Sequence, residues 1–415
     1  MARDLRLFYF FRLLSTSYLF VPVSVAYALS RGLSLVEVML LNTVYCTVVI
    51  FTEVPTGAIA DRVGRRATMM AGALAMVAAC TVYALAHGFA WFAVAEALAA
   101  LSMTLCSGAD SAYLFDLLND HGRGDEYPRR EGTASAWHQA GQALAFAAGG
   151  VLASGNLVLP YLVTAGVASV AFFVALSMGE RYAPANPARP TISPREYAAH
   201  MRDAFRAVRR RGPLLWAIAY SAVVFVLLRA TVYAYQPYLK ESGFDVAQTG
   251  LIYAAVYLVA AAVAHNYDGL RRWLAEPTLV WMLLGTLVVT FLILGSIRGP
   301  WALAIMAVQA AANGLYSPLV KHLLQREIER SHQRATVLSV ESMARRLAFG
   351  AFSPAVGGLM GASGAAAGLI LCGAVGLAGM LALAATAPSR REPVKAGQAS
   401  GLRRQASDPD LKPEA

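Results

Sequence analysis

The stretch Gly57-Ala-Ile-Ala-Asp61-Arg62-Val-Gly64-Arg65-Arg66 places four charged residues in six positions of an otherwise apolar region. A run of about twenty residues with little charge precedes it, and a second such run follows it. Runs of this length are typical of helices that cross a membrane, because backbone polar groups in lipid must be satisfied within the segment. The stretch therefore indicates a short, glycine-flanked connection between two membrane helices.

The composition of the whole chain supports this interpretation. Its 415 residues are 57% hydrophobic and only 14% charged, whereas a soluble protein has about 45–50% apolar and about 25% charged residues. The apolar residues come in long blocks rather than in amphipathic stripes. We expect about twelve spans, at 8–29, 35–59, 67–87, 90–116, 133–154, 157–178, 213–237, 246–265, 277–296, 300–322, 334–356 and 364–386.

The net charge of +10 follows the same topology. Most of the Lys and Arg residues fall in alternate loops and the two termini, and the opposite loops hold only Arg31, Lys240 and Arg298. Cytoplasmic loops carry the excess of Lys and Arg, so we expect an inner-membrane protein with both termini in the cytoplasm. The charge therefore gives no reason to expect nucleic-acid binding. The four cysteines lie in apolar spans without metal or disulfide spacing, which favours buried free thiols.

A polar segment divides the spans into six and six. We expect a six-helix bundle at 1–180, a linker with a basic interfacial helix at 181–212, a second six-helix bundle at 213–386, and a disordered cytoplasmic tail at 387–415. The basic part of the linker is expected to lie on anionic lipid; a binding site for a partner is the alternative.

The two halves repeat each other at a nearly constant offset. Gly149-Gly150 corresponds to Gly357-Gly358, and Asp61-x-x-x-Arg65-Arg66 has a worn copy at Asp268-Gly-Leu-Arg271-Arg272. Parallel repeats with a binding site between the halves are typical of secondary transporters. The expected fold class is thus an all-α membrane protein, with twelve transmembrane helices in two pseudo-symmetric six-helix bundles.

The motif from Gly57 to Arg66 resembles the signature of the major facilitator superfamily, in sequence and in its place after the second span. The span count, the division into halves and the repeat extend the resemblance over nearly the whole chain. Glu53-Val-Pro55-Thr-Gly57 and Ser107-Gly108-Ala-Asp110-Ser-Ala-Tyr-Leu-Phe-Asp116 also look like bacterial exporters of this superfamily. The resemblance implies alternating access by rocking of the two bundles.

The chemistry of the motif suits a conformational latch. Gly57 lets another helix approach, Gly64 permits a tight turn, and Asp61 can cap a helix or pair with Arg65. Such pairs are thought to latch the halves of superfamily members in the outward-open state. The residues expected to form the latch are Gly57, Asp61, Arg62, Gly64, Arg65, Arg66 and Asp116. The alternative is that these charges only fix topology.

Ionisable groups inside spans are costly and indicate function by default. Glu53, Asp110 and His138 are the candidates for proton coupling. Each has a structural alternative: Glu53 as a fixed partner of Arg12 or of the latch, Asp110 as part of the latch, and His138 as a hydrogen-bonded structural residue. Glu96, nearer the outside, is a further candidate, although its side chain could instead extend to the interface.

Polar residues of several spans are expected to line a central cavity, because spans one, four, seven and ten line it in the family that this chain resembles. An unpaired Arg inside a span is expensive, so Arg229 requires a carboxylate or an anionic substrate. Glu341 and Arg345 are four residues apart and are expected to pair on one helix face. The cavity candidates are Tyr18, Asn42, Gln142, Arg229, Tyr233, Asn313, Tyr316 and Glu341.

These features predict a proton-coupled exporter of a small drug-like or secondary-metabolite molecule, expected to be a monomer in contact with lipid. Proton-coupled uptake of an organic anion or nutrient is the alternative, and a non-transporting membrane interaction protein is another. The glycine series of drug–proton antiporters is only partly present, since Ala145-Phe146 stands where those proteins have Gly-Pro. The sequence has no phosphate-binding GxxxxGK[ST] motif and no metal-ligand spacing, so we expect no enzyme activity and no cofactor, with the proton gradient as energy source.

Overall fold

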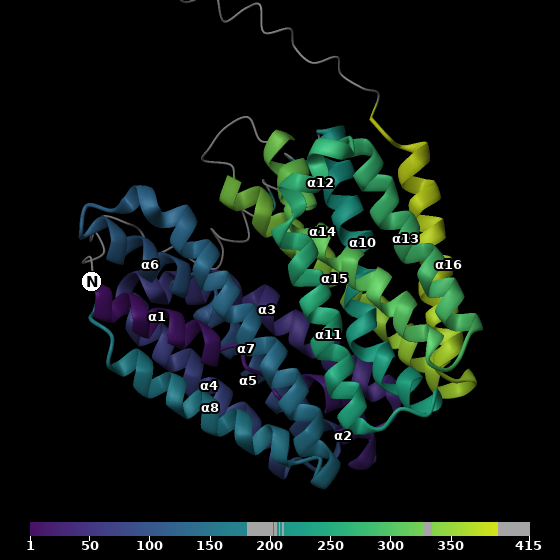
Figure 1. Cartoon of the computed structure of the whole chain (residues 1–415), viewed down its shortest axis with the longest axis horizontal. Helices are drawn as coiled ribbons and strands as arrows, with labels where there is room; N and C mark the ends of the chain where they lie inside the picture. The colour runs from purple at the N-terminus through teal and green to yellow at the C-terminus, as the bar shows by residue number, and fades with distance from the viewer. Residues whose placement is uncertain (181–201, 203–205, 207, 210, 328–333, 389–415) are drawn as a thin grey trace, which may run out of the picture.

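The computed structural model describes residues 1–180, 202, 206, 208–209, 211–327 and 334–388, and within these ranges its regular secondary structure consists of helices joined by short turns (Figure 1). The first group of helices consists of α1 (Ala2–Leu14), η1 (Val21–Val23), α2 (Ser24–Ser30), α3 (Leu35–Val63), α4 (Arg65–Leu85), α5 (Gly88–Cys106), α6 (Ala109–Asn119), η2 (Gly124–Glu126), α7 (Tyr127–Gly155) and α8 (Leu159–Leu176). The second group consists of α10 (Gly212–Glu241), α11 (Val246–His265), α12 (Tyr267–Trp273), α13 (Glu276–Ser296), α14 (Trp301–Glu327), α15 (Arg334–Ser363) and α16 (Ala365–Ala385).

The helices bear out the membrane assignment. Among the described residues, nine helical segments are long and apolar enough to cross a membrane. Helices α7 and α15 have comparable lengths but carry more polar residues, and the first expected span is divided into α1, η1 and α2. Pro22 lies in η1, where a residue without a backbone N–H suits an interrupted helix. Each of the twelve expected blocks coincides with helical residues, while their number as membrane spans stays a prediction.

The helices form two lobes (Figure 1). Helices α1–α8 make the N-lobe and helices α10–α16 make the C-lobe, each with its own buried core. The lobes meet where α3 lies along α15 and where α7 lies along α11. The linker expected at 181–212 and the tail expected at 387–415 fall almost entirely outside the described residues, so the domain boundaries remain predictions.

The repeated glycine pairs lie where the lobes touch. A Cβ at Gly150 of α7 would lie 2.6 Å from the Cα of Gly250 in α11, and one at Gly357 of α15 would lie 2.6 Å from the carbonyl oxygen of Leu35. Only residues without a side chain allow backbones to approach this closely. The lobes are therefore in direct backbone contact at these two places.

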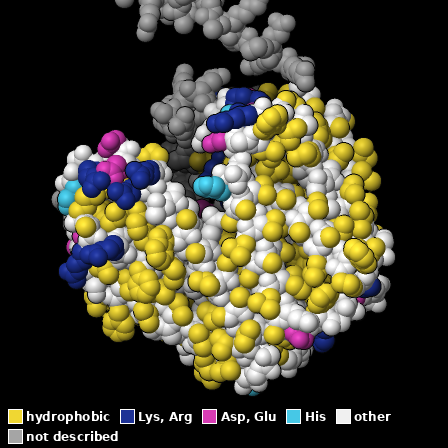
Figure 2. All heavy atoms as spheres, viewed as in Figure 1, with side chains coloured by type: hydrophobic (Ala, Val, Ile, Leu, Met, Phe, Trp, Pro, Cys, Tyr) yellow, Lys and Arg dark blue, Asp and Glu magenta, His cyan; other side chains and the backbone are white. Residues whose placement is uncertain are grey.

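The two ends of the molecule differ. One end, which we call the basic end, holds Arg65, Arg66, Arg123, Arg271 and Arg326. The opposite end holds Arg31, Lys240 and Arg298. Figure 2 shows Lys and Arg side chains gathered at the basic end of both lobes, with a hollow between the lobes. A cleft of about 480 Å³ lies on this side, between α1 and α7 of the N-lobe and α11 and α14 of the C-lobe. The lobes are thus apart at the basic end and joined nearer the opposite end.

Candidate functional site

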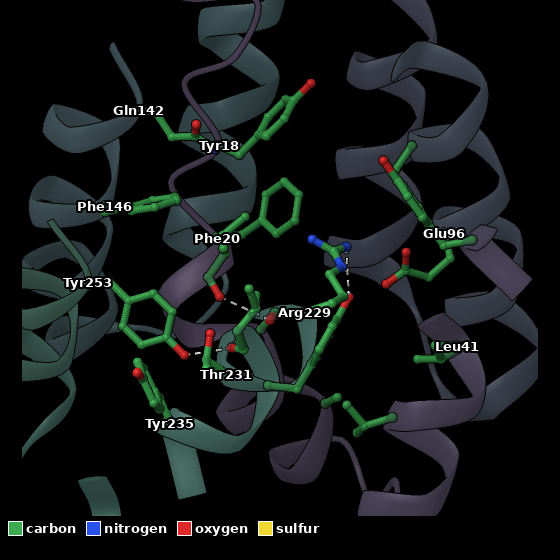
Figure 3. Close-up of a pocket in the computed structure, with 18 of the residues that line it drawn as sticks. Tyr18, Phe20, Leu41, Glu96, Gln142, Phe146, Arg229, Thr231, Tyr235 and Tyr253 are labelled. Carbon is green, nitrogen blue, oxygen red and sulfur yellow. Dashed lines mark hydrogen bonds between the residues drawn. The ribbon is translucent and has the colours of Figure 1, made fainter. Parts of the chain in front are cut away.

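A cavity of about 330 Å³ lies between the lobes (Figure 3). Its lining includes eight tyrosines and three phenylalanines: Tyr18, Phe20, Tyr45, Tyr83, Phe92, Phe146, Tyr161, Tyr233, Tyr235, Tyr253 and Tyr257. Among the residues that line it, Glu96 and Arg229 carry charge. A mostly apolar pocket with a few converging polar groups is the usual form of a small-molecule site, and this volume is near the lower end of their range.

Arg229 enters the cavity from the middle of α10 in the C-lobe. Its guanidinium lies over the rings of Tyr233 and Tyr45, 5.4 Å and 5.8 Å from their centroids, and donates a hydrogen bond of 3.3 Å to the Tyr233 hydroxyl. That hydroxyl donates in turn to Oδ1 of Asn42 on α3, at 2.8 Å. The chain of hydrogen bonds from Arg229 to Asn42 therefore joins the two lobes beside the cavity.

Glu96 enters the same cavity from α5 in the N-lobe. It is hydrogen-bonded to Tyr83, whose ring centroid lies 5.1 Å from that of Tyr161 and 5.9 Å from that of Phe92. Figure 3 shows the Glu96 carboxylate and the Arg229 guanidinium pointing into the same space from different helices. Within the described residues, no ion pair of 4.0 Å or less joins them. Each charged group therefore faces the cavity, and they are not paired with each other.

Gln236 joins the two lobes next to Val21, a residue of the cavity lining. It lies on α10, nearly two helical turns beyond Arg229, and its side chain is buried. Its Oε1 accepts a hydrogen bond of 2.8 Å from the backbone N–H of Val25, and its Nε2 donates one of 3.0 Å to the carbonyl of Val21. Val25 is in the first turn of α2, whose N–H groups have no partner within the helix. A side chain of the C-lobe thus caps a broken helix of the N-lobe.

Comparison with known proteins identifies the family to which this architecture belongs. The family model of the Major Facilitator Superfamily matches residues 6–349. The chain belongs to this superfamily. The chain is also similar to solved transporter structures. They include a variant of the nucleoside transporter NupG (TM-score 0.79, 10% identity, 93% of this chain and 99% of that one), a POT family transporter in complex with 5-aminolevulinic acid (0.75, 13%, 93% and 96%) and a D-xylose–proton symporter (0.69, 14%, 93% and 98%). No curated protein matches the sequence.

The protein is therefore a multi-pass membrane transporter of the major facilitator type, and the predicted family and fold class are confirmed. At these identities the solved structures establish the fold alone. They do not carry over a substrate or a direction of transport.

Most of the predicted cavity residues of this transporter come together. Tyr18, Gln142, Arg229, Tyr233 and Asn313 line the central cavity. Asn42 is fully buried behind Tyr233, to which it is hydrogen-bonded.

Tyr316 and Glu341 lie in a separate polar cluster of the C-lobe. Ser221 donates a hydrogen bond to Glu341 and shares one of 2.9 Å with the Tyr316 hydroxyl. Arg345 pairs with Glu341 at 3.6 Å, as their spacing predicts. Tyr316 and Glu341 therefore have hydrogen-bond and ion-pair partners within the C-lobe, and they do not line the central cavity.

The three proton candidates lie outside the cavity lining. Asp110 forms an ion pair with Arg12 and accepts a hydrogen bond of 2.7 Å from the backbone N–H of Ser111. His138 lines the cleft at the basic end, beside Arg12. Glu53 was considered as a partner of Arg12, but that partner is Asp110.

Glu53 instead reaches across the lobes. The hydroxyl of Ser342 on α15 donates to it at 3.4 Å and accepts from Arg346 at 3.4 Å.

The signature motif surrounds the turn between α3 and α4. Gly64 has a φ of 107°, a conformation that favours glycine, and so permits this turn. Arg65 pairs with Asp61 at 2.5 Å and lies 3.7 Å from Asp116. Arg66 pairs with Glu180 at 2.8 Å. The described ion pairs of these two arginines stay within the N-lobe.

Two further motif residues have open surroundings in this conformation. Arg62 is exposed. A Cβ at Gly57 would meet no atom within 4 Å, so the close approach of another helix that was expected there is absent among the described residues.

Sequence reasoning gave too little weight to two residues. Glu96 was considered as a further proton-coupling candidate or as a residue that extends to the interface, and it lines the cavity. Gln236 was not among the predicted site residues. The common signal was available, since both are polar residues within long apolar blocks.

Proposed function

We propose that the protein is a proton-coupled exporter that moves a small, partly aromatic molecule by alternating access. The observation that carries this proposal is the aromatic cavity between the lobes, into which the N-lobe contributes Glu96 and the C-lobe contributes Arg229. Groups from both lobes contact the same ligand, so binding is coupled to the relative position of the lobes.

We assign the basic end to the cytoplasm and the protein to the inner membrane, with both termini inside. The gathering of Lys and Arg at this end supports the assignment. The basic-end cleft and the central cavity share Tyr257 and Asn313 as lining residues, which supports a route between them. The opposite end is closed by Gln236 and by the glycine contacts. In this orientation the conformation is inward-open, the state in which an exporter loads its substrate.

We propose Glu96 as the site of the coupling proton, ahead of Glu53, Asp110 and His138. Asp110 is neutralised by Arg12, and Glu53 and His138 do not line the central cavity. A carboxylate in the cavity can bind a proton or interact with substrate, and competition between the two couples their movements in opposite directions. The motif residues around Arg65 are proposed as the latch, which gains contacts with the C-lobe only when the basic end closes.

The direction of transport can be tested with purified protein in liposomes under an imposed pH gradient. A panel of radiolabelled aromatic acids, amines and amino acids serves as probe. Export coupled to protons requires that a panel member moves against the direction of the proton, and that dissipating the gradient stops the accumulation. Movement in the same direction as the proton would reject export. Absence of movement for all probes, with protein correctly inserted, would favour a non-transporting interaction protein.

The second candidate function is proton-coupled uptake of an organic anion. The observation in its favour is Arg229, a guanidinium inside a span with no carboxylate within 4.0 Å in the described ion pairs. In this case an acid of the panel would enter with the proton, and substitution of Arg229 would abolish the uptake. The same liposome experiment therefore separates the two functions.

A further inference from the structure

The central cavity carries two opposite charges that attract each other without being in direct contact. Glu96 and Arg229 come from different lobes and are both partly accessible, with no ion pair between them among the described residues. A charged group within a membrane span is costly unless a counter-charge or water is close to it. The arrangement leaves room between the two groups for a ligand that supplies both counter-charges.

The surroundings of Glu96 suit an ammonium group. Tyr83, Tyr161 and Phe92 form a cluster of rings next to the carboxylate, and Phe20 adds a ring whose centroid is 4.9 Å from that of Tyr161. A cation is attracted by the faces of aromatic rings and by a carboxylate, and clusters of this kind recognise organic ammonium ions. Glu96 with its rings is therefore a site for the cationic end of a ligand.

The surroundings of Arg229 suit a carboxylate. Its described hydrogen bond goes to Tyr233 through Nη2, and the guanidinium lies over the rings of Tyr45 and Tyr233. A guanidinium has five N–H donors in a fixed fork that matches a carboxylate with two hydrogen bonds. One edge of this fork is thus oriented by Tyr233, and the remaining donors are available to a ligand.

We propose that the transported substrate is an aromatic zwitterion, a small molecule with one ring, one ammonium group and one carboxylate. The ammonium binds at Glu96, the carboxylate binds at Arg229, and the ring packs against the tyrosines between them. This assignment of the substrate class rests on the proposed transport function of the cavity. A ligand with only one charge leaves the other charged group of the cavity without a counter-charge, which lowers its affinity.

The same arrangement gives the direction of coupling. When the ammonium leaves Glu96, a proton takes its place on the carboxylate; when the next substrate binds, that proton is released. Substrate and proton therefore occupy Glu96 alternately. The ligand contacts both lobes through its two charged groups, so its binding favours closure of the basic end around it.

The test compares three ligands that differ only in their charged groups: phenylalanine, phenethylamine, which lacks the carboxylate, and phenylpropionate, which lacks the ammonium. Calorimetric binding to the purified full-length transporter is measured for each. We expect phenylalanine to bind about tenfold or more tightly than either of the others, since each loses a charge-assisted hydrogen-bonded contact. Alanine, which has both charges and no ring, should bind weakly.

Two variants assign the charged groups to their sites. In Glu96→Gln the preference for phenylalanine over phenylpropionate should disappear, while the preference over phenethylamine remains. In Arg229→Gln the reverse should hold. Asp125→Asn, an acid-to-amide change at an exposed position of the basic end, serves as the matched control and should leave all affinities unchanged. A thermal unfolding curve for each variant shows that it is folded.

Equal affinity of the wild-type protein for the three ligands, or loss of both preferences in both variants, would overturn the assignment. So would a lack of phenylalanine binding, whether or not another molecule is transported. If another panel member still moves against the proton in liposomes, the exporter function stands and only the substrate class is wrong.

Discussion

The interaction of Gln236 with α2 gives the most specific prediction about conformational exchange. Replacement by Leu keeps the approximate size of the side chain and removes both ends of the amide. The hydrogen bonds of 2.8 Å from Val25 and 3.0 Å to Val21 are then lost. The buried N–H of Val25 loses this acceptor, whereas the part-buried carbonyl of Val21 still accepts from the hydroxyl of Ser24. We expect these groups to face water in the outward-open state, so the cost should fall on the outward-closed state alone.

The expected change in the free energy of the closed state follows from the loss of these two hydrogen bonds. Each typical hydrogen bond contributes about 0.5–1.5 kcal/mol net, and loss of a helix N-cap costs about 0.5–2 kcal/mol. We therefore expect Gln236→Leu to destabilise the closed state by about 2 kcal/mol, which shifts the equilibrium towards the outward-open state about thirtyfold. Gln236→Glu keeps an acceptor for Val25 and should shift it less.

The shift can be measured by distances between spin labels in a variant without the four native cysteines. One label pair at Ser30 and Lys240 reports on the opposite end, and another at Arg129 and Arg326 reports on the basic end. In Gln236→Leu the first distance should lengthen and the second should shorten in the same sample.

The matched control is Gln309→Leu. Gln309 is also buried, but it accepts a hydrogen bond of 2.5 Å from Tyr235 within the C-lobe. This variant should lose stability without a change in either distance distribution. If Gln236→Leu has the wild-type distributions at both label pairs, Gln236 does not hold the lobes together and the reasoning is wrong.

Further predictions concern the lobe contact, a buried ion pair and the signature motif. Gly150→Val should abolish the outward-closed state, because its Cβ would lie 2.6 Å from a backbone atom of the C-lobe, whereas Gly155→Val, with no atom within 4 Å, should leave the label distances unchanged. Asp110→Asn should lower the free energy of unfolding by about 3–5 kcal/mol, because it leaves Arg12 without its ion-pair partner. The double variant with Arg12→Met should regain much of this loss. A double variant as unstable as the single one would contradict the pairing. Arg65→Ala should cost at most about 1 kcal/mol of stability, because its ion pairs are partly exposed; transport in liposomes should nevertheless fall at least tenfold, and unchanged transport would mean that the motif only fixes topology.

Local sequence patterns were sufficient for the secondary structure and the family. The length of each apolar block predicted a helix, since lipid requires backbone hydrogen bonds within the segment. The spacing of Glu341 and Arg345 predicted their pair, since residues four apart share a helix face. The glycine pairs indicated the repeat of the two halves, and Gly150 and Gly357 of these pairs lie at the two lobe contacts.

Contacts between residues far apart in the chain could not be predicted from local sequence patterns. Membrane helices are apolar on nearly all sides, so their sequence contains little information about which side faces a partner. Asp110 was predicted to couple protons or to belong to the latch, and Tyr316 and Glu341 were predicted to line the cavity. In the structure Asp110 forms an ion pair with Arg12, 98 positions away. Tyr316 and Glu341 are both hydrogen-bonded to Ser221.

The sequence by itself thus determined that this is a helical membrane transporter with a repeated architecture, because hydropathy, glycine spacing and the motif from Gly57 to Arg66 are local properties. Only the tertiary structure decided that Glu96 and Arg229 face one aromatic cavity and that Gln236 caps α2 of the other lobe. These contacts join residues from different lobes. They depend on the rotation of each helix about its axis, which is set by packing among many helices rather than by any one of them.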